Sequence, residues 1–271
     1  MPDPSLQARI DSAAAYEALM VPALFGPWAP RVADAAEIRP GQRVLDVACG
    51  TGVLAREALA RVRPGGSVKG LDANPGMLEV GRRIAREVDW WRGVAESLPF
   101  ADRSFDAVVS QFGLMFFDDR RAALREALRV LVPEGRLAFA VWDALDNIPA
   151  YAAEVALLER LAGPAAADAV RAPFALGDRD GLAALSEAAG VAAVAVTTGR
   201  GTARFPSVRV MVEADLRGWL PAMGVVLEED LIARILDEAE RALAPYVRAD
   251  GGVEFAARAH IVTGRRGAER G

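Results

Sequence analysis

The sequence of 271 residues contains one cysteine, Cys49, and one histidine, His260. A single cysteine excludes an internal disulfide and a thiolate metal cluster. A single histidine excludes a histidine-rich metal site, and a Ser-His-Asp or Cys-His triad would have to use His260. We therefore expect no bound metal, and we interpret Cys49 as a small packing residue.

Long apolar runs and a basic leader are also missing. No run reaches the roughly 18 apolar residues of a membrane span, and residues 1–5 do not resemble a secretory signal. These absences predict a cytoplasmic protein. The formal charge of −5 argues against binding nucleic acid by neutralising its phosphates. A composition of 52% hydrophobic and 25% charged residues predicts a packed core.

In the first half of the chain, strand-like segments alternate with amphipathic ones. Strands are expected at residues 43–47, 67–71, 88–93, 105–110 and 136–142. Helices are expected between them, at residues 53–62, 75–84 and 119–131. This alternation predicts βαβ units in an α/β fold, with a doubly wound parallel sheet and a crevice at the carboxyl ends of its strands.

The second half has a different pattern. Strands are expected at residues 191–198, running on toward Phe205, and at residues 253–263. About fifty residues separate them, too many for a hairpin loop. This insertion contains two amphipathic segments, at residues 207–220 and 228–246, which we interpret as a helical cap or as helices that complete the core.

The most informative segment is the apolar strand and small-residue turn at residues 44–52. Gly50 and Gly52 allow positive φ and close approach of a ligand, and amides at the start of a helix attract anions. Asp72 lies about twenty residues later, where an acid can accept hydrogen bonds from ribose hydroxyls. Each feature alone also suits an ordinary turn, but together they predict a ligand that contains a nucleoside.

Two further residues bear on the choice of nucleoside. Ala55 stands where a dinucleotide-binding loop has its third glycine, a position that tolerates small residues. Asp46 is an acid in a strand end that is usually apolar in such loops. Its carboxylate suits an ammonium group on the ligand, and it equally suits a role in holding the neighbouring loop amides.

Four segments resemble motifs of the class I S-adenosylmethionine-dependent methyltransferases, in the small-molecule (type 11) branch that includes the ubiquinone and menaquinone C-methyltransferases. They lie at residues 46–52, 70–72, 93–106 and 131–137. The resemblance covers about residues 40–142. It implies a Rossmann-like seven-stranded sheet, mostly parallel with an antiparallel last strand, and helical cap insertions. The implied cofactor is S-adenosylmethionine, with S-adenosylhomocysteine as product.

The resemblance also implies roles for residues. The loop after Asp46 would surround the methionine part of the cofactor, and Asp72 would bind the ribose. Val94 stands where many relatives have an acid that binds adenine, and Glu134 replaces the first glycine of the usual Pro-Gly-Gly turn. The cofactor-binding candidates are Asp46, Ala48, Cys49, Gly50, Gly52, Asp72, Ala73, Met77, Val94, Ala95, Glu96 and Gln111.

The implied reaction is methyl transfer to carbon, oxygen or nitrogen of a small molecule by in-line displacement. Positioning supplies most of the catalysis, and a general base is needed only if the nucleophile carries a proton. The candidates for a catalytic role are Gln111, Asp143 and Tyr16, the last on an N-terminal lid helix. The candidates for the substrate pocket, each equally suited to the core, are Tyr16, Trp28, Met115, Trp142 and Trp219.

We divide the chain into residues 1–142 (lid helices and the cofactor-binding half of the sheet), 143–190 (a connection and a cap helix) and 191–271. The third part holds the last two strands and a cap insertion at about residues 206–250, and all three form one catalytic domain. The sequence does not decide whether the protein is a monomer or a homodimer. The alternatives to a methyltransferase are an NAD(P)-dependent oxidoreductase and a non-catalytic module that binds S-adenosylmethionine.

Overall fold

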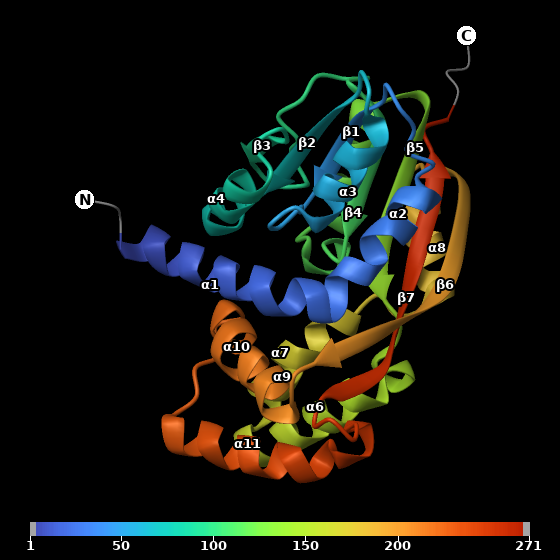
Figure 1. Ribbon diagram of the computed structural model, residues 1–271. Coiled ribbons are helices and arrows are strands. Elements are labelled where there is room, and N and C mark those ends of the chain that lie inside the picture. The colour runs from blue at the N-terminus through green and yellow to red at the C-terminus, as the bar shows by residue number, and fades with distance from the viewer. Residues whose placement is uncertain (1–3, 268–271) are drawn as a thin grey trace.

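The computed structural model describes residues 4–267. Its centre is a seven-stranded sheet with the order β3-β2-β1-β4-β5-β7-β6 (Figure 1). The strands are β1 (Arg43–Val47), β2 (Ser67–Asp72), β3 (Asp89–Arg92), β4 (Phe105–Gln111), β5 (Leu131–Trp142), β6 (Ala192–Phe205) and β7 (Val253–Arg265).

Strand directions confirm the expected sheet. Strands β1 to β5 pair in parallel, whereas β7 runs antiparallel to both β5 and β6. Parallel sheets need helical crossovers on both faces, which explains the buried apolar character of β1 and β4. A classical dinucleotide-binding sheet has the order 3-2-1-4-5-6, so the antiparallel β7 between β5 and β6 distinguishes this topology.

The helices that flank the sheet begin at residues that the sequence marks. The side chain of Asn74 accepts a hydrogen bond from the amide of Gly76, and that of Asp119 accepts one from Ala122, which are N-caps. The flanking helices are α2 (Ala29–Ala35), α3 (Val53–Val62), α4 (Pro75–Ile84), α5 (Arg120–Val130) and α8 (Arg179–Ala188), with the short η3 (Leu114–Phe116) before α5.

An N-terminal helix and a helical cap lie at the carboxyl ends of the parallel strands. The N-terminal part comprises α1 (Pro4–Met20), a π-helical turn η1 (Val21–Phe25) and η2 (Gly26–Trp28). In Figure 1, α1 runs between the sheet and the cap. The cap contains η4 (Leu145–Asn147), α6 (Pro149–Ala162), α7 (Pro164–Arg171), η5 (Ala172–Phe174), α9 (Val208–Ala214), a π-helical turn η6 (Asp215–Trp219), α10 (Leu220–Ala222), α11 (Glu229–Ala242) and η7 (Ala244–Tyr246).

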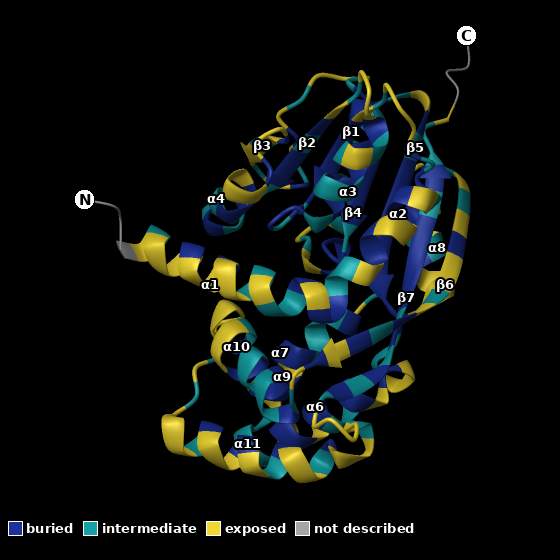
Figure 2. Ribbon diagram, viewed as in Figure 1, coloured by how far each residue is buried: buried dark blue, intermediate teal, exposed yellow. Residues whose placement is uncertain are grey.

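The cap combines both long connections into one packed unit. Helix α11, from the insertion before β7, presents the buried residues Ile232, Ile235, Leu236 and Ala239 and packs on α6 and α9. Its outer face is exposed, as Figure 2 shows. The spacing of these residues is that of one helix face, so the amphipathic pattern at residues 228–246 reflects packing within the cap.

Trp28 belongs to the core and not to a substrate pocket, which corrects one expectation. Its side chain is buried, and a Cβ added at Gly199 or Gly201 of β6 would lie 3.2 or 2.7 Å from the indole ring. The ring also meets Phe112 and Trp142 edge-on, with centroids 6.0 and 6.2 Å away. The two glycines leave space on β6 that the indole fills.

No helix within residues 4–267 combines the length and the apolar character that crossing a bilayer requires. The division of the chain at residues 142 and 190 remains a prediction.

We expect Trp28→Ala to lower the free energy of unfolding by about 3–5 kcal/mol, because it leaves a large cavity between η2 and β6. Urea denaturation measures this loss. Trp91→Ala on β3 is the matched control, since Trp91 is 37% exposed, and it should cost about 1 kcal/mol or less. Equal losses in the two variants would contradict the assignment of Trp28 to the core.

Candidate active site

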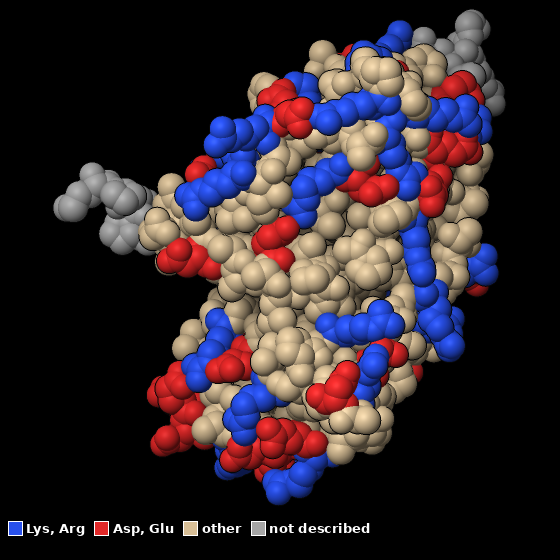
Figure 3. All heavy atoms as spheres, viewed as in Figure 1, with Lys and Arg blue, Asp and Glu red and all other residues tan. Residues whose placement is uncertain are grey.

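A cavity of about 720 Å³ lies where the strand ends, the N-terminal helix and the cap meet. Its floor includes Asp46 near the end of β1, Gln111 at the end of β4 and Trp142 at the end of β5. Tyr16 and Phe25 line it from the N-terminal part, and the cap supplies a largely aromatic and apolar wall. Figure 3 shows the surface hollowed between α1 and the cap.

The loop between β1 and α3 gives this cavity its polar end. Gly50 has φ of 56° and Gly52, the N-cap of α3, has φ of 88°. A Cβ built on Gly50 would meet no atom of the described residues within 4 Å. One on Gly52 would lie 2.2 Å from the Trp90 ring. Gly50 therefore leaves room for a ligand, whereas Gly52 allows close packing against β3.

Asp72 holds this loop in place from the end of β2. One carboxylate oxygen accepts a hydrogen bond from the Gly50 amide at 2.8 Å, and the other accepts one from the Asn74 amide at 2.8 Å. Burial raises the pKa of Asp72, while these amide donors lower it. The Ala73 amide also lowers the pKa of Asp72. Because a carboxylate has about four acceptor sites, Asp72 keeps capacity for a hydroxyl donor from a ligand.

Asp46 carries a buried carboxylate that the protein leaves unsatisfied. The residue is 1% exposed, and neither carboxylate oxygen has a hydrogen-bond partner in the described chain. Burial raises the pKa of Asp46, and the nearby charge of Asp72 raises it further. Because buried polar groups are normally paired, a donor on a bound ligand fits here. The Ala55 amide also lowers the pKa of Asp46, so the alternative that Asp46 only holds loop amides stays open.

The N-terminal helix α1 is fixed to the loop by Glu17. Its carboxylate accepts a hydrogen bond from the Thr51 hydroxyl and pairs with Arg56 of α3 at 2.8 Å. Tyr16, the preceding residue, lines the cavity, with its ring 5.3 Å from that of Phe25. Burial raises the pKa of the Tyr16 hydroxyl, so this group remains protonated and can donate a hydrogen bond.

The cavity brings together half of the expected cofactor-binding residues, namely Asp46, Ala48, Cys49, Gly50, Met77 and Gln111. The amide nitrogen of Gln111 donates to the Phe25 carbonyl at 3.0 Å, and its carbonyl oxygen has no partner among residues 4–267. The other expected residues are not in the cavity wall and stay predictions; they are Gly52, Asp72, Ala73, Val94, Ala95 and Glu96. Of these, Asp72 is hydrogen-bonded to Gly50, which lines the cavity. Glu96 accepts a hydrogen bond from the Asp118 amide.

Asp143 does not face this cavity, so its candidacy for catalysis was wrong. It is buried and forms ion pairs with Arg258 at 2.9 Å and His260 at 3.2 Å. It also accepts hydrogen bonds from Ala144 and Asn147. These partners, with desolvation opposing them, lower the pKa of Asp143. The carboxylate therefore joins the end of β5 to β7.

Two of the residues expected in the substrate pocket, Trp28 and Met115, do not line the cavity. Met115 is 3% exposed and packs into the main core, as Trp28 does. Tyr16, Trp142 and Trp219 do line the cavity. The indole nitrogen of Trp219 donates to the Ala169 carbonyl at 2.7 Å, which fixes this ring in the cap wall.

Sequence reasoning missed two acids in the cap. Asp215 begins η6 and lines the cavity, and Glu154 lies on α6 beside it. Both are buried, and their carboxyl groups contact one another. One signal in the sequence could have found Glu154. It falls three residues after Tyr151 and one before Val155, on a helix face that is otherwise apolar.

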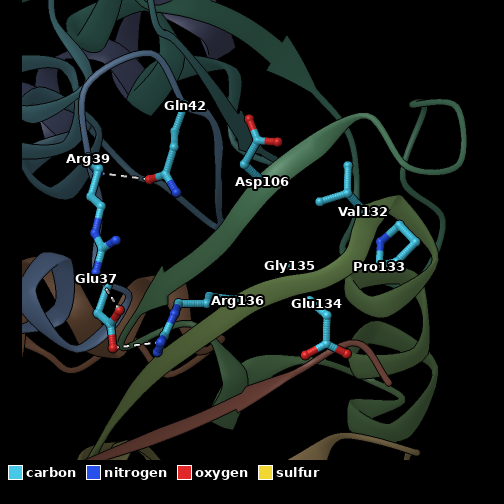
Figure 4. Close-up of a pocket in the computed structure, with 9 residues that line it drawn as sticks. All are labelled: Glu37, Arg39, Gln42, Asp106, Val132, Pro133, Glu134, Gly135 and Arg136. Atoms are coloured by element: carbon cyan, nitrogen blue, oxygen red, sulfur yellow. Dashed lines mark hydrogen bonds and ion pairs between the residues drawn. The ribbon is translucent and has the colours of Figure 1, made fainter. Parts of the chain in front are cut away.

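A second hollow, of about 340 Å³, lies at the opposite end of the strands. Figure 4 shows Glu37 paired with two arginines of this hollow: it accepts from Arg39 at 3.0 Å and from Arg136 at 2.6 Å. Ligands of such sheets bind outside the carboxyl ends of the strands, so this hollow is not the candidate site. Within residues 4–267, no group of three or more His, Cys, Asp or Glu side chains is placed to hold a metal ion.

Comparisons with known proteins match the first half of the chain. Residues 45–139 match the family model described as a methyltransferase domain. A demethylmenaquinone methyltransferase from Renibacterium salmoninarum is 48% identical over 113 residues, which are 42% of this chain and 46% of that protein. A ubiquinone/menaquinone biosynthesis C-methyltransferase from Ectopseudomonas mendocina is 43% identical over 116 residues, 41% of this chain and 45% of its own. The chain thus spans about half the length of the curated relatives it matches.

Solved structures share the fold over most of the chain. A putative methyltransferase from an antibiotic biosynthesis pathway of Anabaena variabilis has a TM-score of 0.62 at 15% identity, covering 86% of this chain and 95% of that one. A putative methyltransferase from Bacillus halodurans has a TM-score of 0.58 at 20% identity, covering 89% and 99%. Residues 45–139 thus match a methyltransferase domain, and the solved structures share the fold of the chain around it.

Proposed function

We propose that the chain transfers a methyl group from S-adenosylmethionine to a small, largely apolar or aromatic molecule. One observation carries this proposal: a single cavity has the glycine loop and Asp46 at one end and aromatic cap residues at the other. Its volume lies within the range of about 300–1,000 Å³ typical of small-molecule sites. A cofactor at the loop would therefore face an acceptor held by the cap.

The residues at the polar end suit this cofactor. Asp46 offers its carboxylate to the ammonium group, Gly50 leaves space for close approach, and Asp72 keeps acceptor capacity for a ribose hydroxyl. When bound, S-adenosylmethionine supplies an electrophilic methyl group on a sulfonium. The negative charges of Asp46 and Asp72 complement a ligand with cationic centres.

The residues of the chain mainly hold the two reactants in position and exclude water from the cavity. Phe25, Trp142 and Trp219 surround the cavity with apolar surface that excludes water. The free carbonyl oxygen of Gln111 can accept a hydrogen bond from the acceptor, which orients it without removing a proton. Holding two reactants in line is worth about 7–11 kcal/mol of barrier, so methyl transfer to an activated carbon, oxygen or nitrogen needs no strong base.

The oxidoreductase alternative loses support, because the antiparallel β7 and the matched family both differ from dinucleotide-binding enzymes. The non-catalytic alternative is tested by turnover of labelled methyl groups across small aromatic acceptors. Methylated product is expected. Tight binding of S-adenosylhomocysteine with no transfer to any acceptor would favour the non-catalytic module. A cytoplasmic location and a monomeric or homodimeric state remain predictions.

Asp72→Ala should weaken binding of S-adenosylhomocysteine about tenfold or more, because charge-assisted bonds to the ribose are lost and the Gly50 amide loses its acceptor. Isothermal titration calorimetry measures the change. Asp89→Ala is the control, since Asp89 pairs with Lys69 at the other end of the neighbouring strand. Unchanged affinity in a folded Asp72→Ala variant would refute the ribose assignment.

Gly50→Val should abolish S-adenosylhomocysteine binding, because the side chain would fill the open space beside the loop. Positive φ makes this substitution strained wherever the side chain points, so the control must share that strain. Gly41→Val does: Gly41 has φ of 84° and equally open surroundings, in the turn before β1. Equal affinities of the two variants, measured by calorimetry, would show that Gly50 does not adjoin the ligand.

A further inference from the structure

The methyl-transfer chemistry described above does not use the two acids of the cap. Asp215 is 6% exposed and lines the cavity, and Glu154 behind it is fully buried. Both oxygens of Glu154 and Oδ2 of Asp215 lack a hydrogen-bond donor among the described residues. The two carboxyl groups contact one another. The donor available within the pair is therefore a proton that the two groups share.

Burial of these two acids raises their pKa values. Desolvation raises the pKa of Asp215 to about 7, and desolvation together with the charge of Asp215 raises that of Glu154. Above about pH 7 the pair therefore keeps one proton and carries one negative charge. A buried charge is costly unless it is paired, so a cation from a ligand would stabilise the ionised pair.

No cation of the described chain neutralises the pair. Arg217 lines the same cavity, but its guanidinium bonds Glu213 at 2.8 Å and Glu229 at 2.6 and 2.7 Å. The groups that do adjoin the pair are aromatic: Tyr151 is electrostatically coupled to both acids, and its ring lies 5.5 Å from that of Phe174.

The backbone at Asp215 is also unusual. Asp215 opens a five-residue π-helical segment, η6, directly after α9. Single π turns within helices occur frequently at functional sites. The apolar face of α9 continues into this segment through Leu216, so the π turn places an acid in the cavity wall where an apolar residue would complete the packing.

We propose that the Asp215–Glu154 pair binds a protonated amino group of the methyl acceptor. This inference rests on the proposed methyl transfer and narrows its substrate to an aromatic or apolar amine. Carboxylate oxygens only accept, and an ammonium brings up to three N–H donors and a positive charge, whereas a hydroxyl brings one donor and no charge. Tyr151 and Phe174 line the same cavity, and an aromatic ring attracts a cation placed over its face.

The amino group acts here as an anchor. An ammonium has all its valence electrons in bonds and is not a nucleophile, so the methyl group goes to another atom of the acceptor. Asp215 and Glu154 are thus specificity-determining residues, and they lie outside residues 45–139, which match the methyltransferase family model. The cap, and not the loop, would then separate this chain's acceptor from a quinone.

The test compares amines with alcohols of the same shape. Tryptamine and tryptophol, phenethylamine and phenethyl alcohol, and 4-phenylbutylamine and 4-phenylbutanol are titrated at pH 7.5 into protein saturated with S-adenosylhomocysteine. We expect at least one amine to bind ten times more tightly than its alcohol. Asp215→Asn and Glu154→Gln should each remove this preference. Glu240→Gln, on the exposed face of α11 and paired with Arg209, lies outside the cavity wall and should keep it.

Three results would overturn the inference: alcohols that bind as tightly as their amines, an amine preference that survives in folded Asp215→Asn and Glu154→Gln, or no binding by any amine. Affinity for S-adenosylhomocysteine checks that each variant is folded. If neither variant folds, the comparison in the unaltered protein decides. Failure of the unaltered protein to bind S-adenosylhomocysteine would instead refute the proposed function, so the two failures are distinguishable.

Discussion

The site depends on one hydrogen bond between neighbouring parallel strands, from the Gly50 amide to the Asp72 carboxylate. It joins the loop after β1 to the end of β2 and fixes the backbone around Gly50 in a conformation with positive φ. The same carboxylate is the group expected to bind a ribose. The Asp72 side chain therefore determines both the conformation of the loop and the binding of the ligand, so a change at Asp72 alters both.

The remainder of the fold places a lid and a cap against this loop. Glu17 links α1 to the start of α3, and the long β6–β7 pair carries the insertion that forms much of the cap. The cavity therefore has a polar end built by the sheet and an aromatic end built by the connections. The match to the methyltransferase family model covers residues 45–139, so the connections that form the cap lie outside it.

The sequence predicted the sheet half well because its signals are local. The glycine turn and the acid that ends the second strand each fix nearby backbone. It failed where tertiary contacts decide. Trp28 is core because two distant glycines on β6 receive its ring, and Asp143 is structural because Arg258 and His260 come from β7. Asp215 and Glu154 went unnoticed since their pairing joins two separate connections.

A crystal structure with S-adenosylhomocysteine tests the central claim most directly. The account predicts that the ribose hydroxyls bond to Asp72, that the ammonium group lies at Asp46, and that the sulfur faces the aromatic wall of the cap. A ligand whose sugar lies away from Asp72, or a cavity closed by its own side chains, would contradict it.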